Sequence, residues 1–217
     1  MSAQDDVERC WYALTLHQGC AGSAAAAVLE ELVEAYGEPH RHYHTLDHIR
    51  ALLALLELHG HGAADPRALR LAILFHDVVY DPSRHDNEEA SAAVAAERLT
   101  RLRFPEALVA RVALYIVATR HDRPGEAVGD GDLALLLDLD LSILAAAPGD
   151  YQAYASAVRR EYGFVPDDLY RAGRRRVLAG FLTRGRIYLT EPLRALWEEP
   201  ARANLATERA ALAEVLP

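Results

Sequence analysis

The sequence predicts an all-α protein, a helical bundle that forms a single domain over residues 1–217. Three observations support this fold class. Ala, Leu, Arg and Glu, which are good helix formers, dominate the chain. Apolar residues recur at steps of three and four rather than two, which is the helical period. No strand run, linker or internal repeat stands out, and a hydrophobic fraction of 51% with 25% charged residues is ordinary for a globular protein.

Start signals delimit several of the expected helices. Thr45 can cap a helix that opens at Leu46, and Asp65 stands before Pro66 in the same role. Prolines open three later helices in the same way, and glycines mark the loops. The run 133–141 is apolar enough for a strand, but its surroundings favour a buried helix. The predicted helices cover residues 5–17, 23–36, 45–59, 66–79, 86–102, 105–119, 132–144, 150–161, 166–183 and 191–215.

Composition excludes several classes of function. The chain contains no lysine, so lysine Schiff bases, pyridoxal phosphate attachment and a lysine-containing phosphate loop are excluded. A net charge of −9 argues against a long nucleic acid as partner. Two cysteines are too few for a disulfide framework and suit the reducing cytoplasm. No apolar run approaches the roughly 20 residues of a membrane span, and the acidic N-terminus lacks a signal-peptide layout, so we expect no membrane partner.

Histidine is concentrated in one stretch of the chain. Nine of the ten histidines lie within residues 40–121. His44 and His48 are four residues apart around a predicted helix start, so both can approach one point. His76-Asp77 ends an apolar predicted helix, and His121-Asp122 follows another. Neighbouring residues on a helix face different ways, so an adjacent pair reaches one ion only at a helix end or bend.

Two carboxylates are embedded in a run of leucines, at Asp138 and Asp140. Burying a carboxylate costs several kcal/mol unless it is paired or bound to a metal. A cation that is also ligated by imidazoles would account for their position. Such mixed donors suit Fe, Mn, Zn, Ni or Co better than Ca or Mg alone.

These elements, in this order, resemble the HD superfamily of metal-dependent phosphohydrolases. His48-Ile49-Arg50, Leu74-Phe75-His76-Asp77-Val78-Val79 and Leu137-Asp138-Leu139-Asp140-Leu141 are similar to its three motifs. In the third, leucines replace the common Ala and Arg. The resemblance covers about residues 40–145 and leaves a helical extension over 146–217. Arg-His-Tyr-His-Thr-Leu-Asp-His, from residue 41, is similar to the branch of predicted HD-superfamily hydrolases.

The resemblance implies a site in which His48, His76, Asp77 and Asp140 hold a divalent metal, with Asp138 as the alternative to Asp140. The expected ion is Mn, Fe, Co, Ni or Zn, with Mg an alternative, and one or two ions are allowed. A metal-activated water would attack phosphorus. Glu88 is the expected acid/base carboxylate, and Asp77 is counted with it as catalytic.

The expected substrate is a small phosphate ester, with a nucleotide favoured. Its phosphate would contact residues placed around the metal ligands: Arg84, Arg120, His121 and His44. A second ion would need further histidines such as His44, His85 or His121. Two other functions stay open, a di-iron oxygenase of the HD type and a non-catalytic metal-binding sensor. A homodimer is also left open.

Overall fold

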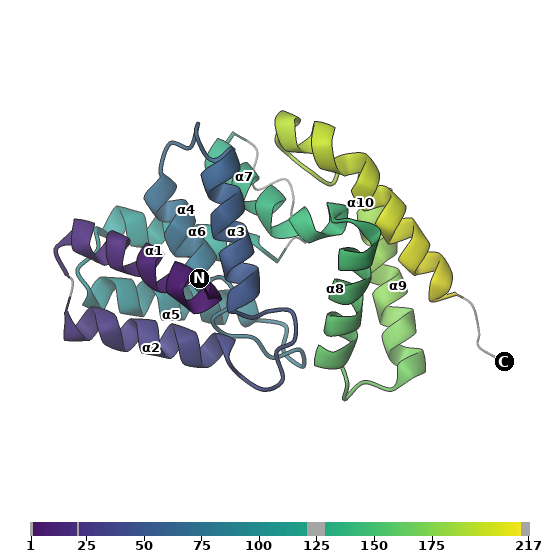
Figure 1. The fold of residues 1–217 in the computed structure, drawn as a ribbon, viewed down its shortest axis with the longest axis horizontal. Coiled ribbons are helices and arrows are strands. Elements are labelled where there is room, and N and C mark those ends of the chain that lie inside the picture. Colours follow the sequence, from purple (N-terminus) through teal and green to yellow (C-terminus); the bar gives the residue numbers. More distant parts are fainter. Residues whose placement is uncertain (1, 21, 121–128, 214–217) are drawn as a thin grey trace. The chain divides into compact units, whose positions relative to one another are not determined.

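The computed structural model describes residues 2–20, 22–120 and 129–213, and within them it contains helices and no strand (Figure 1). The all-α prediction is therefore confirmed. Contacts divide the chain into two compact units, Met1–Leu136 and Leu137–Pro217. The single domain over 1–217 stays a prediction.

The first unit is built around one buried helix, α4. Helix α4 contacts α1, α3, α5 and α6, and its residues from Ala68 to Phe75 are buried with the exception of Arg70. An apolar surface on all sides of a helix requires neighbours on all sides. The helices of this unit are α1 (Ala3–Gln18), α2 (Ser23–Tyr36), α3 (Leu46–His59), α4 (Pro66–Phe75), α5 (Asn87–Arg101), α6 (Glu106–Ala118) and the first part of α7 (Gly131–Asp140).

The second unit begins within α7 and has a core of its own. Aromatic and aliphatic side chains, among them Tyr151, Leu178 and Tyr188, form its buried cluster. The backbone N–H groups of Ile187 and Tyr188 donate to the Glu198 carboxylate, which fixes the loop before α10. The other elements of this unit are a 3-10 helix, η2 (Leu141–Ala145), α8 (Pro148–Glu161), α9 (Asp167–Thr183) and α10 (Glu191–Ala211).

Helix starts follow the predicted caps, while several helix ends differ from prediction, among them that of α10, which ends at Ala211 rather than at residue 215. Thr45 and Asp65 accept hydrogen bonds from the backbone N–H groups of Asp47 and Ala68, as N-caps do. Helix α4 ends at Phe75, four residues before the predicted end. The predicted helix 132–144 is α-helical only to Asp140 and continues as η2. No helix in the described part of the chain is both long and apolar enough to cross a membrane.

Candidate metal centre

The start of α3 and the end of α4 bring two histidines and an aspartate together. His48 lies in the first turn of α3, behind the Thr45 cap, and His76 is the C-cap residue of α4. Both imidazoles are buried, whereas the Asp77 side chain is 18% exposed. Helix α4 ends at Phe75, so His76 and Asp77 lie at a helix end, where neighbouring residues can approach one point.

The ligand atoms of these three residues are close enough to share an ion. His48 Nε2 lies 3.3 Å from His76 Nε2 and 3.9 Å from Asp77 Oδ2. His76 Nε2 lies 3.0 Å from Asp77 Oδ2. Two atoms that each bind one ion at about 2.1 Å can be at most ~4.2 Å apart. All three separations meet that limit, and all the ligand atoms lie within 4.8 Å of one another.

The hydrogen bond on the other nitrogen of His76 also suits a metal ligand. His76 Nδ1 lies 3.0 Å from the main-chain oxygen of Ile73. A carbonyl oxygen only accepts, so Nδ1 carries a proton, and Nε2 is the nitrogen that can present a lone pair to an ion when the ring is neutral. A hydrogen bond of this kind is usual for metal-bound histidines, since it fixes the tautomer and the ring orientation. The residues present therefore fit a divalent ion.

Asp77 is held in its charged form. Burial raises the pKa of the Asp77 carboxyl, but His76, His44 and His48 act in the opposite direction and outweigh it. The net effect keeps the pKa of Asp77 below its usual range. A carboxylate that stays ionised near neutral pH is the form that binds a cation.

A buried arginine ties the two halves of this site together. The guanidinium of Arg41 has no exposed surface and donates to Glu38 at 2.9 Å. It also donates to main-chain oxygens of His44 at 3.3 Å, Asp77 at 2.6 Å and Val78 at 3.1 Å. Arg41 therefore connects the loop before α3 to the turn after α4. Nothing in the local sequence identifies these partners, and the role was not predicted.

Aromatic rings surround the cluster. The ring of His44 stacks on Tyr80 with centroids 4.1 Å apart. Tyr43 lies 4.9 Å from the His48 ring by the same measure. His44 thus lies beside the metal-ligand candidates, although the grouped ligand atoms of the described residues do not include it. Its predicted contact with substrate stays a prediction.

Glu88 lies near the cluster and is partly buried. It is the second residue of α5. Burial raises the pKa of the Glu88 carboxyl, and the charge of Asp77 adds to this effect. A hydrogen bond from the backbone N–H of Glu88 and the charge of Arg120 lower the pKa, but the net shift is upward. A carboxyl that keeps its proton to higher pH can serve as a general acid. Its predicted role remains a prediction.

The two arginines predicted to bind phosphate already have acidic partners. Arg84 Nε and a terminal nitrogen donate to Asp86 at 2.8 and 2.9 Å, with both side chains exposed. Arg120, which follows the end of α6, donates to Glu89 in the first turn of α5. A substrate phosphate would have to compete with these carboxylates. His121 lies outside the described residues.

The structure gives the two leucine-flanked aspartates different surroundings. Both oxygens of Asp138 accept hydrogen bonds within the second unit, from Leu189 N at 2.6 Å, Thr190 N at 2.7 Å and Thr190 Oγ1 at 2.6 Å. Burial raises the pKa of Asp138, and these hydrogen bonds partly offset the effect. Asp138 therefore anchors the start of α10, which accounts for its burial without a metal. Asp140 is the last residue of α7, and its role as a ligand stays a prediction.

The fold and this cluster define a helical protein with a buried His-His-Asp group that can hold a divalent ion. The HD domain family matches residues 43–151, just over half of the chain. The chain belongs to the HD domain family, as its motifs predicted. HD domains bind divalent metals and are usually metal-dependent phosphohydrolases. Searches of curated proteins and of solved structures each find no match.

Proposed function

We propose that this HD protein is a metal-dependent phosphohydrolase that acts on a small phosphate ester, with a nucleotide as the expected substrate. The observation that carries the proposal is the convergence of His48 Nε2, His76 Nε2 and Asp77 Oδ2 within 4.8 Å of one another. Family membership supports the same chemistry. Asp140 would complete the ligand set.

The proposed reaction requires a metal ion, its ligands, one proton donor and a cationic side chain for the phosphate. A bound divalent ion would supply a Lewis acid and lower the pKa of a water molecule. Asp77 and the two imidazoles would hold that ion, and the Ile73 carbonyl would keep His76 in the required tautomer. Glu88 would donate the proton to the leaving oxygen. Because the chain lacks lysine, arginines such as Arg120 are its only permanently charged cationic side chains for the phosphate oxygens.

The proposal concerns a small substrate rather than a long nucleic acid. The net charge of −9 disfavours a polyanion, while a single phosphate needs only local positive charge. A cytoplasmic location and a homodimer remain predictions. Size-exclusion chromatography with light scattering tests the homodimer.

The test is metal analysis of the purified protein, followed by phosphate release from a panel of nucleotides with Mn, Co, Ni and Mg. Asp77→Ala should weaken metal binding more than about 100-fold, abolish phosphate release and leave the helical circular dichroism intact. Asp47→Ala is the matched control, because Asp47 lies beside His48 but its side chain is 73% exposed. Unchanged metal binding in Asp77→Ala would refute the site. Two irons per chain with oxygen uptake would indicate an oxygenase instead.

A further inference from the structure

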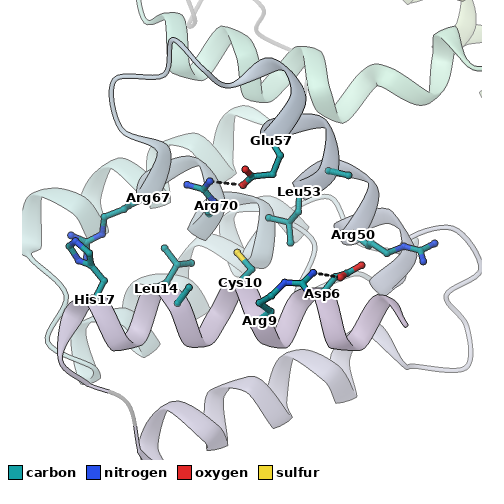
Figure 2. Close-up of a pocket in the computed structure, with 12 residues that line it drawn as sticks. Asp6, Arg9, Cys10, Leu14, His17, Arg50, Leu53, Glu57, Arg67 and Arg70 are labelled. Atoms are coloured by element: carbon teal, nitrogen blue, oxygen red, sulfur yellow. Dashed lines mark hydrogen bonds and ion pairs between the residues drawn. The ribbon is translucent and has the colours of Figure 1, made fainter. Parts of the chain in front are cut away.

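A cavity of about 510 Å³ lies in the first unit between α1, α3 and α4, and none of the metal-ligand candidates lines it (Figure 2). Ligand sites typically measure roughly 300–1,000 Å³, so the cavity can hold a small organic molecule. Among its lining residues, Arg50 follows His48 by two positions on α3. Residues two apart on a helix point about 200° apart, so the cavity lies on a different face of α3 from the metal centre.

Two helices each line this cavity with side chains from one continuous face. From α3, Arg50, Leu53, Ala54 and Glu57 line it, a spacing of three, one and three that defines one helix face. A corresponding stripe of α1 runs from Asp6 to His17. The lining therefore consists of adjacent side chains on two packed helices, with α4 contributing the third wall.

The inner part of the cavity is apolar. Leu14 and Leu53 are buried residues that line it, and the partly buried Cys10 lies beside them. Burial raises the pKa of the Cys10 thiol to about 11, so Cys10 is uncharged near neutral pH. These side chains offer a surface for an apolar group and no charge of their own.

The charged side chains of the cavity are mostly cationic. Four arginines line it, whereas the acidic lining residues are Asp6 and Glu57, which leaves a formal charge of +2 with His17 neutral. The whole chain carries −9. Arg9 pairs with Asp6, Arg50 with Asp47 at 2.9 Å and Arg70 with Glu57 at 2.6 Å, whereas Arg67 donates to the uncharged Gln18 amide at 3.0 Å. An excess of positive charge in a concave, partly apolar surface attracts anions.

We propose that this cavity is a binding site for a small amphiphilic anion, a molecule with an apolar body and one acidic group. The apolar body would lie on the Leu14 and Leu53 surface, and the acidic group would face the arginines. The proposal is independent of the phosphohydrolase activity, because it uses none of the residues assigned to the metal centre.

The test compares two fluorescent probes that differ in one group. The full chain is titrated with 8-anilinonaphthalene-1-sulfonate, and in parallel with N-phenyl-1-naphthylamine, which has the same rings without the sulfonate. We expect one sulfonate site per chain and weaker binding of the neutral probe. Ala13→Trp, at an exposed residue that lines the cavity, should abolish binding of both probes.

Two charge variants of the Arg70–Glu57 ion pair should change the affinity for the sulfonate probe in opposite directions. Arg70→Gln should weaken binding of the sulfonate probe about tenfold, since a charge-assisted hydrogen bond to the sulfonate is lost. Glu57→Gln removes the competing carboxylate and should strengthen binding about threefold. The neutral probe should respond to neither.

Two further variants complete the design. Arg9→Gln, at a side chain that is 58% exposed, provides a second charge variant if Arg70→Gln does not fold. Arg176→Gln, on the exposed surface of α9, is the matched control and should leave both affinities unchanged. Full binding in Ala13→Trp, or a sulfonate affinity that no cavity-lining charge variant changes, would overturn the proposal.

Discussion

The guanidinium of Arg41 donates a hydrogen bond of 2.6 Å to the main-chain oxygen of Asp77. The same terminal nitrogen donates to the main-chain oxygen of His44, four residues before His48. One buried side chain thus holds both segments that carry the metal-ligand candidates. The separation of His48 from Asp77 therefore depends on a residue that touches no ligand atom.

Replacing Arg41 should loosen the metal site. Arg41→Lys keeps the charge but cannot reproduce the planar fork that reaches His44, Asp77 and Val78. We expect metal affinity to fall by about 10- to 100-fold, as for other residues that orient ligands. Competition with a metallochromic chelator measures it. Arg50→Lys, at a 43% exposed arginine of α3, is the control. Equal metal affinity in Arg41→Lys and the wild type would contradict the assigned role.

Glu88→Gln should separate proton transfer from metal binding. The amide cannot donate a carboxylic proton, so we expect phosphate release to fall by about 10²- to 10⁴-fold while metal affinity is retained. Steady-state kinetics and metal titration on the same sample measure both. Glu89→Gln, one position along α5, should keep most of the activity. A Glu88→Gln protein with wild-type turnover would remove Glu88 from the mechanism.

Asp138 and Asp140 should respond differently to substitution by alanine. Asp138→Ala leaves the N–H groups of Leu189 and Thr190 without their acceptor, and should lower the free energy of unfolding by roughly 2–5 kcal/mol. Asp140→Ala should instead weaken metal binding with a smaller loss of stability. Urea denaturation of metal-free protein and metal titration distinguish the two. The reverse pattern would make Asp138 the ligand.

A buried ion pair should stabilise the second unit. Arg174 binds Glu208 through two nitrogens at 2.8 and 3.0 Å, with side chains only 10% and 13% exposed. Glu208→Ala would leave the Arg174 charge buried and unpaired, at a cost of roughly 3–5 kcal/mol. Thermal and urea unfolding measure it. Arg175→Ala, at the exposed neighbour, should change stability by less than about 0.5 kcal/mol.

Cys10 should make stability depend on pH in the alkaline range. Folding raises the pKa of its thiol from 9.0 to about 11. Below about pH 9 the thiol is protonated in both states, so its contribution is constant. As pH rises towards about 11, the unfolded chain loses the proton first, and this contribution to stability declines. Urea denaturation at several pH values should therefore show a smaller alkaline loss for Cys10→Ala than for the wild type. Parallel curves would contradict the raised pKa.

Local patterns predicted most of the fold. The three- and four-residue spacing of apolar residues predicted the helices, and the caps at Thr45 and Asp65 are observed where they were expected. The early end of α4 could not be predicted in this way, since Val78 and Val79 continue the apolar pattern. The main-chain oxygens of Asp77 and Val78 bond to Arg41 instead. That partner is distant in sequence, so no local signal indicates it.

The candidate site was predictable to a similar extent. The order of His48 and the His76-Asp77 pair was enough to predict that they lie together, because the motifs specify helix ends. The pairing of Arg84 with Asp86 and of Arg120 with Glu89 was not predicted. Asp138 could not be separated from Asp140 by sequence, since both lie among leucines. Only the hydrogen bonds to Leu189 and Thr190 show that Asp138 anchors a helix start.

The hydrogen bond from His76 Nδ1 ends on a main-chain oxygen rather than on a side chain. Every amino acid at position 73 supplies that oxygen, so point substitutions there leave the acceptor in place. Substitution of Ile73 should therefore not change which ring nitrogen of His76 carries the proton. A lineage can exchange core side chains around α4 and still inherit the same tautomer, as long as the last turn of the helix persists.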